Sequence, residues 1–301
     1  METGEDKIRW GTEQRLEFIE FRLFWEGGIN RSDITEFFGV SVPQASKDLA
    51  QYRELVPANI EYDASGKRYL ARPKFKPRFL KPDPDRYLNQ LRTIADRIVA
   101  AQETWLERAP PADAMPIPHR RVEAGVLRAL LDAIRRSRSV EILYQSMNVI
   151  RPEAIWRRIT PHAFGHDGLR WHVRAFCHID HGFKDFILSR TFELRNEEAP
   201  GAPASDDKVW STYFTVILRP NPKLSEAQQE AVAVEYGMKK NSVEVSLRKA
   251  MLYYFEKRMR LDLAESSSRP QEVPIVIANK KEFYGALKEA SSVSQLPKST
   301  E

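Results

Sequence analysis

Apolar residues recur at helical spacing near the beginning of the chain. In the stretch EQRLEFIEFRLFWEG (13–27), Leu16, Ile19 and Leu23 fall on one face of a helix, which the glycines at 27 and 28 end. A second, shorter helix is predicted for RSDITEFF (31–38). The chain therefore opens with two amphipathic helices.

A third helix follows a tight glycine turn. Gly39 can adopt the positive φ that such a turn needs, and Ser41 can cap a helix over about residues 42–52. Pro43 is tolerated there because the first turn of a helix makes no use of its missing N–H. The side chains expected to point inward are Ala45, Leu49 and Tyr52.

An alternating pattern then predicts a β-hairpin. In NIEYDASGKRYLAR (59–72), apolar and polar residues alternate on both sides of an Ala-Ser-Gly turn. This order of elements resembles a winged helix-turn-helix, which has two helices, a turn, a third helix and a hairpin. We expect a small helical domain with a two-stranded wing.

Three stretches rich in proline or in small residues interrupt the pattern, at 72–85, 108–119 and 196–207. Between the first two, a connector helix is predicted over about residues 85–107. The predicted units are residues 1–81, a helical linker at 82–118, a middle unit at 119–203 and a C-terminal unit at 204–301.

The middle unit has one amphipathic helix, RRVEAGVLRALLDAIRRSR (120–138), followed by strand patterns. The strands are predicted in SVEILYQS (139–146), AIWRRITPHAFG (154–165), LRWHVRAFCH (169–178) and FKDFILSRTFEL (183–194). Short strands in succession favour a small, strongly bent antiparallel sheet that is barrel-like.

The C-terminal unit alternates strands with helices, so the whole chain is an α+β protein of several domains. Strands are predicted at 210–220, 241–247 and 273–279, and helices from Ser225, at 248–261 and at 281–290. The helix at 248–261 carries an apolar face of Met251, Leu252, Phe255 and Met259. That face could hold a dimer together, or it could pack on the sheet of its own domain.

Composition points to a protein of the reducing cytoplasm. The chain has 301 residues, 42% of them hydrophobic, without a run of eighteen apolar residues, so we expect no membrane span. The polar start METGEDKIRW lacks the apolar core of a signal peptide. The single cysteine, Cys177, excludes an internal disulfide and is interpreted as a buried structural thiol.

The distribution of charge indicates that the N-terminal unit binds DNA. The net charge is +5, and residues 64–81 hold seven basic side chains and no acid. Such a stretch can neutralise DNA phosphates, while polar side chains on the third helix can reach base edges in the major groove. The candidate DNA-binding residues are Ser41, Gln44, Ser46, Lys47 and Gln51 on the helix, with Lys67 and Arg68 in the wing.

The strand at 169–178 carries the other candidate site. His172 and Arg174 share one face of an extended strand, and Trp171 lies on the opposite face, where a core position is favoured. If this face lies beside Tyr144 and Ser146 of the strand at 139–146 and beside Arg190, these side chains together form a concave site. Such a site suits a nucleotide or short oligonucleotide. The candidate ligand-binding residues are Tyr144, Ser146, His172, Arg174 and Arg190.

A metal-dependent or nucleic-acid-processing enzyme is the alternative. Five histidines lie within residues 162–181, and His162 and His166 are four residues apart, but the segment is predicted as strand and turn. The chain has no glycine-rich phosphate loop, nucleophile elbow, or His-Glu-x-x-His motif. We therefore expect no catalytic residue, no bound metal and no cofactor. We favour a sensor over an enzyme.

Residues 168–190 resemble the signature of the WYL-domain family of bacterial transcriptional regulators. The motifs Arg174-Ala175-Phe176-Cys177 and Leu188-Ser189-Arg190 match that signature. The name-giving Trp-Tyr-Leu is Trp171-His172-Val173 in this chain, a change that keeps the site polar. The order of units resembles the winged helix, WYL domain and WCX extension of that family.

The resemblance implies more than the residues do alone. It implies an Sm- or SH3-like β-barrel for the middle unit, a homodimer, and an inverted-repeat DNA operator. In detail the chain resembles the BREX- and CBASS-associated repressors of anti-phage defence operons. A ligand at the middle unit would then shift the dimer between arrangements that do and do not bind DNA.

Overall fold

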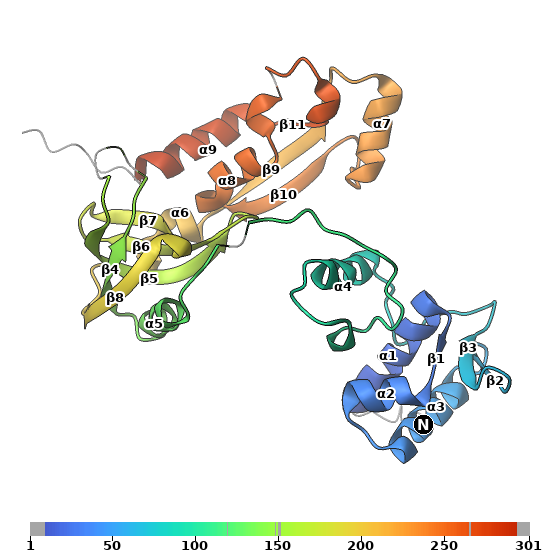
Figure 1. Cartoon of the computed structure of the whole chain (residues 1–301). Coiled ribbons are helices and arrows are strands. Elements are labelled where there is room, and N and C mark those ends of the chain that lie inside the picture. Colours follow the sequence, from blue (N-terminus) through green and yellow to red (C-terminus); the bar gives the residue numbers. More distant parts are fainter. Residues whose placement is uncertain (1–9, 119, 148, 150–151, 265, 294–301) are drawn as a thin grey trace, which may run out of the picture. The chain divides into compact units, whose positions relative to one another are not determined.

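The computed structural model describes residues 10–118, 120–147, 149, 152–264 and 266–293 (Figure 1). The chain forms two compact units that divide between Ile117 and Pro118. The first unit holds the winged helix and the connector. The second holds the middle domain (α5 and β4–β8) and the C-terminal domain (α6–α9 and β9–β11).

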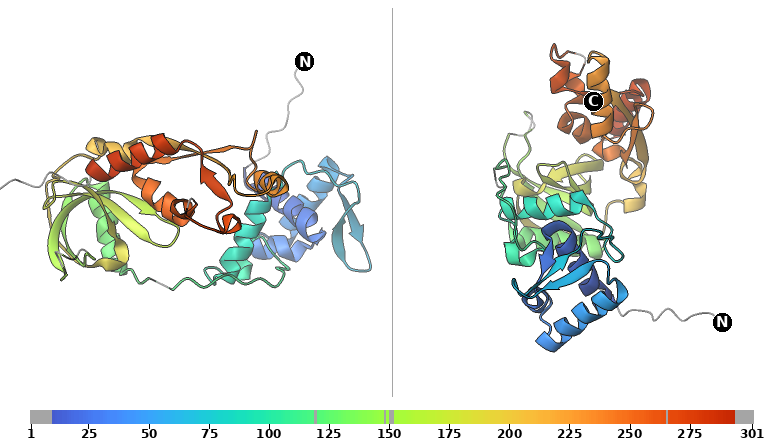
Figure 2. Two further views of the ribbon diagram at one scale, coloured as in Figure 1. Left: turned by 90° about the horizontal axis from the view of Figure 1, so that it is seen from above. Right: turned by 90° about the vertical axis from the view of Figure 1, so that its right-hand side faces the viewer.

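The winged helix has the predicted order of elements (Figure 2, blue and cyan). It consists of α1 (Trp10–Glu26), β1 (Gly28–Ile29), α2 (Arg31–Phe38), α3 (Val42–Leu55), β2 (Ile60–Asp63) and β3 (Arg68–Ala71). The strands pair antiparallel in the order β1-β3-β2. Sequence reasoning missed β1 because two residues carry no periodicity.

The beginning of α3 is fixed as the sequence predicts. Gly39 has a φ of 63°, and the backbone N–H of Gln44 donates to Ser41 Oγ at 3.4 Å. The predicted inward side chains of α1 and α3 are confirmed as core. Leu16, Ile19, Leu23, Ala45, Leu49 and Tyr52 are all at most 1% exposed and belong to one cluster.

The prediction of one connector helix to residue 107 is wrong. Helix α4 (Pro84–Ala95) ends where Arg97 takes a φ of 56°, and only the short turn η1 (Ala101–Glu103) follows. The reversal brings Trp105 back against α1, where its ring centroid lies 5.5 Å from that of Phe18. Burial of aromatic surface against α1 therefore overrides the helical pattern of the connector.

The middle domain is a five-stranded antiparallel sheet with α5 (Ala124–Arg135) packed on it (Figure 1). Its strands are β4 (Ser139–Tyr144), β5 (Ile155–His166), β6 (Trp171–Cys177), β7 (Gly182–Ile187) and β8 (Thr191–Glu198), with the turn η2 (Leu188–Arg190) between the last two. The strand predicted at 183–194 is thus two strands. The order β7-β6-β5-β4-β8 leaves β7 and β8 as edges, so a closed barrel is not shown.

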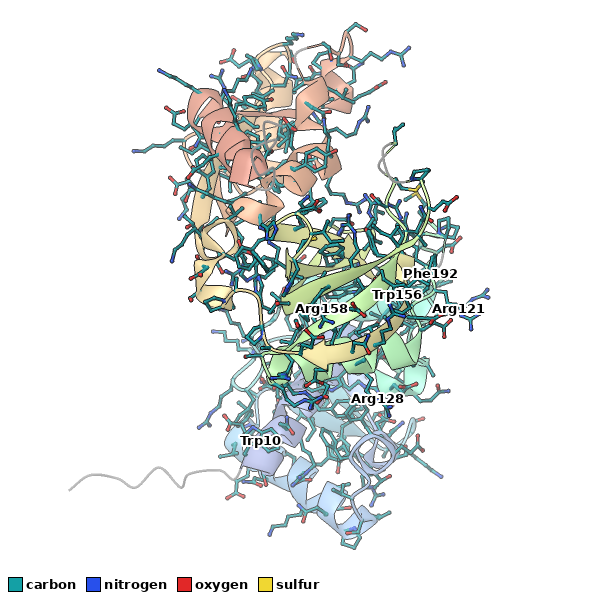
Figure 3. The ribbon with its side chains drawn as sticks, turned by 90° about the vertical axis from the view of Figure 1, so that its left-hand side faces the viewer. Trp10, Arg121, Arg128, Trp156, Arg158 and Phe192 are labelled. Carbon is teal, nitrogen blue, oxygen red and sulfur yellow. The ribbon has the colours of Figure 1, made fainter. Side chains whose placement is uncertain are left out.

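One side of this sheet is its core and the other is lined by larger polar and aromatic side chains. Cys177 is fully buried in the core, as predicted, and burial raises the pKa of its thiol. On the outer side, Trp156 and Arg158 lie two residues apart on the same face of β5 (Figure 3). The guanidinium of Arg195 stacks on the Trp156 ring at 3.7 Å.

The C-terminal domain packs helices on a second sheet of order β10-β9-β11. Its elements are η3 (Ala204–Asp206), α6 (Lys208–Ser211), β9 (Tyr213–Pro220), α7 (Glu226–Glu235), β10 (Val243–Arg248), η4 (Lys249–Met251), α8 (Leu252–Arg258), η5 (Leu261–Leu263), η6 (Pro270–Glu272), β11 (Ile275–Ile277) and α9 (Lys280–Val293). The Ser225 and Gln228 capping box is confirmed at α7. The predicted strand at 210–220 begins only at Tyr213, because α6 precedes it.

The helix predicted at 248–261 is shorter than expected, because α8 spans only Leu252–Arg258, and three of the four residues of its predicted apolar face pack within its own domain. Leu252 is fully buried, and Phe255 and Met259 pack against the same core as β9 and β11. This is the simpler of the two interpretations of that face. In the part of the chain that the structure describes, no helix combines the length and apolar character needed to span a membrane.

Candidate DNA interface and interdomain cavity

Helix α3 presents most of its candidate DNA-binding side chains to the surface. Ser41 and Lys47 are exposed, and Gln44, Ser46 and Gln51 are half-buried. The guanidinium of Arg31, at the start of α2, reaches Ser46 Oγ at 3.5 Å. The outer face predicted for this helix is therefore the face that solvent, and a bound DNA, can reach.

The two wing candidates are placed differently. Lys67 is exposed in the hairpin turn, at a φ of 50°, where the backbone N–H groups of Ser65 and Gly66 donate to the Asp63 carboxylate. Arg68 instead folds back over Gly28, and its side chain is only 14% exposed.

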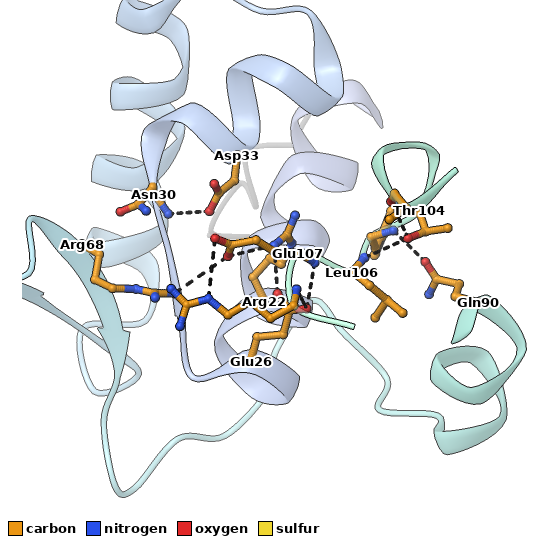
Figure 4. Close-up of polar contacts among 12 residues, drawn as sticks. Arg22, Glu26, Asn30, Asp33, Arg68, Gln90, Thr104, Leu106 and Glu107 are labelled. Carbon is orange, nitrogen blue, oxygen red and sulfur yellow. Dashed lines mark hydrogen bonds and ion pairs between the residues drawn. The ribbon is translucent and has the colours of Figure 1, made fainter. Parts of the chain in front are cut away.

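The side chain of Arg68 points toward a carboxylate of the connector. Its Nη2 lies 4.0 Å from Glu107 Oε2 in the connector, and Arg22 of α1 donates to the same carboxylate at 3.1 Å (Figure 4). Glu26 accepts from the backbone N–H of Glu107 at 2.8 Å, which holds the connector in place. Arg68 Nε and Nη2 are buried and make no hydrogen bond to the described residues there, and the side chain does not extend toward the open side of the hairpin.

The basic segment after the wing is anchored by a buried acid that sequence reasoning missed. Glu20 of α1 is fully buried and accepts from the backbone N–H groups of Arg78, Phe79 and Leu80 at 2.7–2.9 Å. Three backbone donors satisfy this carboxylate, so the chain is fixed while its basic side chains stay outside. The exposed cations of this segment are Arg72, Lys74, Lys76, Arg78 and Lys81.

In the middle domain, Arg174 is buried against acids and does not line an open concavity with the other candidates. Only 3% of the residue is exposed. Its Nε lies 2.7 Å from Asp207 Oδ2 and its Nη2 3.2 Å from Oδ1, a bidentate pair, and its Nη1 lies 3.3 Å from Asp185 Oδ1. Asp207 belongs to the segment that begins the C-terminal domain.

Asp207 joins the two domains. It caps α6 by accepting from the N–H of Trp210 at 3.0 Å, and His162 Nε2 of β5 lies 3.1 Å from its other oxygen. Burial disfavours the charge of Asp207, but the hydrogen bonds from His162 and Arg174 prevail and lower the pKa of its carboxyl to about 2. The carboxylate is therefore ionised at neutral pH.

His172 shares the outward face of β6 with Arg174, as predicted, and it too is buried. Its Nε2 lies 2.9 Å from Asp167 Oδ2, and its ring packs on Tyr254 of α8 at 4.8 Å between centroids. The hydroxyl of Tyr254 donates to Asp185 at 3.0 Å, and burial raises the pKa of this tyrosine. This face of β6 is covered by the C-terminal domain.

The remaining candidates lie elsewhere. Tyr144 belongs to the core of the sheet, where its hydroxyl accepts from the N–H of Ile187 at 3.3 Å. Ser146 and Arg190 are half-buried at the ends of β4 and η2. The core position predicted for Trp171 is wrong, because this side chain is 53% exposed and packs on His166.

A cavity of about 390 Å³ lies beside Arg174, and we call it the interdomain cavity. It is lined by Arg174, Lys184, Asp185, Val209, Lys249, Ala250, Tyr253, Tyr254, Leu287, Ala290 and Ser291. Three cations and one acid line it, and two tyrosines add aromatic surface. Two of the cations have acidic partners outside the lining: Lys184 Nζ lies 3.0 Å from Asp180 Oδ2, and Lys249 Nζ lies 2.7 Å from Glu289 Oε2. A concave site of this size, charge and composition suits a small aromatic anion. Arg174 is the candidate ligand residue that lines it.

Among the described residues, no group of three or more histidine, cysteine, aspartate or glutamate side chains is arranged to hold a metal ion. The histidines of the 162–181 region have other neighbours. His162 bonds Asp207, and His178 lies 3.0 Å from the Thr160 hydroxyl. His162 and His166, four residues apart in the sequence, both belong to β5.

Comparison with known families accounts for the domain order. Residues 11–93 match the BrxR transcriptional regulator winged helix-turn-helix domain. Residues 125–195 match the WYL domain, and residues 213–283 match the BrxR transcriptional regulator C-terminal dimerization domain. Two of the three matched models are domains of transcriptional regulators.

Relatives match over nearly the whole chain. The DNA-binding transcriptional repressor CapW of Escherichia coli (strain KTE188) is 38% identical over 286 residues, which cover 95% of both chains. CapW of Pseudomonas aeruginosa is 37% identical over 280 residues, covering 93% of both. CapW of Stenotrophomonas maltophilia is 38% identical over 289 residues, covering 95% of this chain and 96% of its own.

Among solved structures, Proteasome accessory factor B/C (PafBC) of Arthrobacter aurescens aligns with 94% of this chain and 48% of its own. The identity of 14% and the TM-score of 0.25 are too low to support a structural argument. The sequence relatives carry the assignment. The chain belongs to the family of the DNA-binding transcriptional repressor CapW, and its domains match a BrxR winged helix-turn-helix domain, a WYL domain and a BrxR C-terminal dimerization domain.

Proposed function

We propose that the protein is a homodimeric repressor that binds an inverted-repeat operator through α3 and the wing. The main support for the proposal is the exposed polar face of α3. A basic segment follows the wing, and Glu20 accepts hydrogen bonds from its backbone. Backbone anchoring positions the cations to contact phosphates on both sides of the groove that α3 enters. The relatives named as DNA-binding transcriptional repressors support the same function.

We propose Lys67 as a residue of the wing that binds a DNA phosphate without regard to sequence. Its replacement by alanine is expected to weaken binding to operator and to random DNA alike. The slope of log affinity against log salt should fall by about one unit for each phosphate that the variant no longer neutralises. Binding titrations at four salt concentrations measure it. Weaker binding to the operator alone would mean that Lys67 reads bases.

The interdomain cavity supports a proposal for control. We propose that it binds an anionic, nucleotide-like ligand, with Lys184 and Lys249 binding phosphate and Tyr253 stacking on the base. Because the cavity lies between the middle domain and the domain that matches a dimerization family, an occupant can favour one dimer arrangement over another. A difference of about 1–3 kcal/mol between the two arrangements suffices for control.

Replacing Lys249 by alanine is expected to weaken the effect of such a ligand on operator binding about tenfold or more, because the variant cannot form a charge-assisted hydrogen bond there. Operator affinity without ligand should stay near that of the parent. The probes are adenosine 5′-monophosphate and inorganic phosphate, titrated into the protein–operator complex. Lys288→Ala, an exposed change on α9, is the matched control. A Lys249→Ala protein that responds to a probe as the parent does would place the ligand elsewhere.

We propose further that the repressed genes form an anti-phage defence operon next to the gene for this protein, and that it acts in the cytoplasm. The support is the resemblance to defence-associated repressors. A reporter fused to the DNA upstream of its own gene tests this. Expression should rise when the protein is deleted and fall when it is restored. Unchanged expression in both cases would argue against repression at that site.

A further inference from the structure

A buried carboxylate lies directly behind the outer face of α3. Asp48 is fully buried, one helical turn after Gln44. Arg15 of α1 binds both of its oxygens, with Nε at 2.6 Å from Oδ2 and Nη2 at 3.2 Å from Oδ1. Gln44 Nε2 donates to Oδ1 at 2.9 Å. The side chain of Gln44 is thus held from behind by a fixed ion pair.

This arrangement determines which way the Gln44 amide points. An ionised carboxylate only accepts hydrogen bonds, so the group of Gln44 that faces Asp48 must be its NH₂. A glutamine on an open surface can rotate its amide and offer either a donor or an acceptor. Here the carbonyl oxygen is directed away from Asp48. One N–H of the amide also remains after the bond to the carboxylate.

The position of Gln44 gives this orientation a use. Gln44 is the third residue of α3 and half-exposed, and the N-terminal residues of a recognition helix contact base edges. A carbonyl oxygen beside an N–H matches N6 and N7 of adenine, which offer a donor and an acceptor in the major groove.

We propose that Asp48 and Arg15 preset the amide of Gln44 so that it reads an adenine in each operator half-site. The inference rests on the proposed function, because it requires α3 to lie in the major groove. Gln44 is the specificity-determining residue, and Asp48 and Arg15 are positioning residues that do not touch DNA. With Asp48 replaced by asparagine, the neighbouring amide offers both donor and acceptor, and Gln44 is free to turn.

The test is selection of bound sequences by the full-length protein from a library with randomised half-sites. The parent should select adenine at one position per half-site roughly tenfold or more over other bases. Gln44→Ala should lose that preference and keep the others. Gln44→Glu should shift it toward cytosine, whose N4 amino group only donates. Asp48→Asn should flatten it at that same position alone.

Full adenine preference in a folded Asp48→Asn protein would overturn the positioning role. If Gln44→Ala lowers affinity without altering any base preference, Gln44 contacts the backbone and the inference is wrong. A parent that selects no sequence at all would instead contradict the proposed function. Circular dichroism and thermal melting show whether each variant is folded. If Asp48→Asn is not, Gln44→Ala and Gln44→Glu still test Gln44 as the residue that reads the base.

Discussion

Replacing Arg174 by alanine is expected to lower the free energy of unfolding of the second unit by about 3–5 kcal/mol. The change leaves the buried carboxylate of Asp207 without its bidentate partner, and Asp185 loses a cation as well. Breaking one side of a buried pair costs far more than forming it gains, because the remaining charge stays desolvated. Urea unfolding of the two proteins measures the difference.

Arg195→Ala is the matched control. It removes an arginine from β8 of the same sheet that is about half exposed, together with its ion pair to Glu141 and its stacking on Trp156. A surface ion pair and an exposed cation–π contact contribute about 1 kcal/mol each at most, so the control should lose clearly less stability than the Arg174 variant. Equal free energies of unfolding for the Arg174 and Arg195 variants would mean that the ion pair with Asp207 does not stabilise the contact between the two domains.

The second large effect is expected on DNA. Replacing Gln44 and Lys47 together by alanine should reduce operator affinity by about 1–3 kcal/mol for each base contact removed. Both side chains lie on the outer face of α3 and neither belongs to its core, so the fold should persist. Fluorescence anisotropy with labelled operator measures the loss, and unrelated DNA is the control. Unchanged operator affinity in the folded double variant would contradict the assignment of α3 as recognition helix.

Local physics accounts for what the sequence predicts well. The capped start of α3, the Gly39 turn and the inward residues of α1 depend on spacing and backbone preference within a few residues. The strands of the middle domain follow from alternation, and the polar outer face of β6 follows from the same period. Such features need no knowledge of distant contacts.

The features that the sequence does not predict depend on contacts between residues far apart along the chain. Asp207 lies in a stretch of small and acidic residues that is typical of a linker, and nothing in that stretch indicates burial. Only the fold brings it to Arg174 and so turns a predicted ligand residue into half of an ion pair. Arg68 is a similar case, because its partner Glu107 comes from the connector, far along the chain from the wing.

The interdomain cavity shows the same limit. Lys184 belongs to β7, and Lys249 and Tyr253 belong to a segment that the sequence presents only as an amphipathic helix. No local pattern connects these positions. Of the five candidate ligand-binding residues, Arg174 alone lines the cavity. The C-terminal contribution to the site becomes visible only in the folded chain.

Footprinting of the full-length protein on the DNA upstream of its own gene tests the central claim most directly. A dimer that places two copies of α3 in the major groove should protect two half-sites related by two-fold symmetry. Their centres should lie about one helical turn, or a whole number of turns, apart. The Gln44→Ala, Lys47→Ala double variant should abolish the protection at the same protein concentration. Protection of a single asymmetric site, or an unchanged footprint with the double variant, would contradict recognition by a symmetric pair of α3 helices.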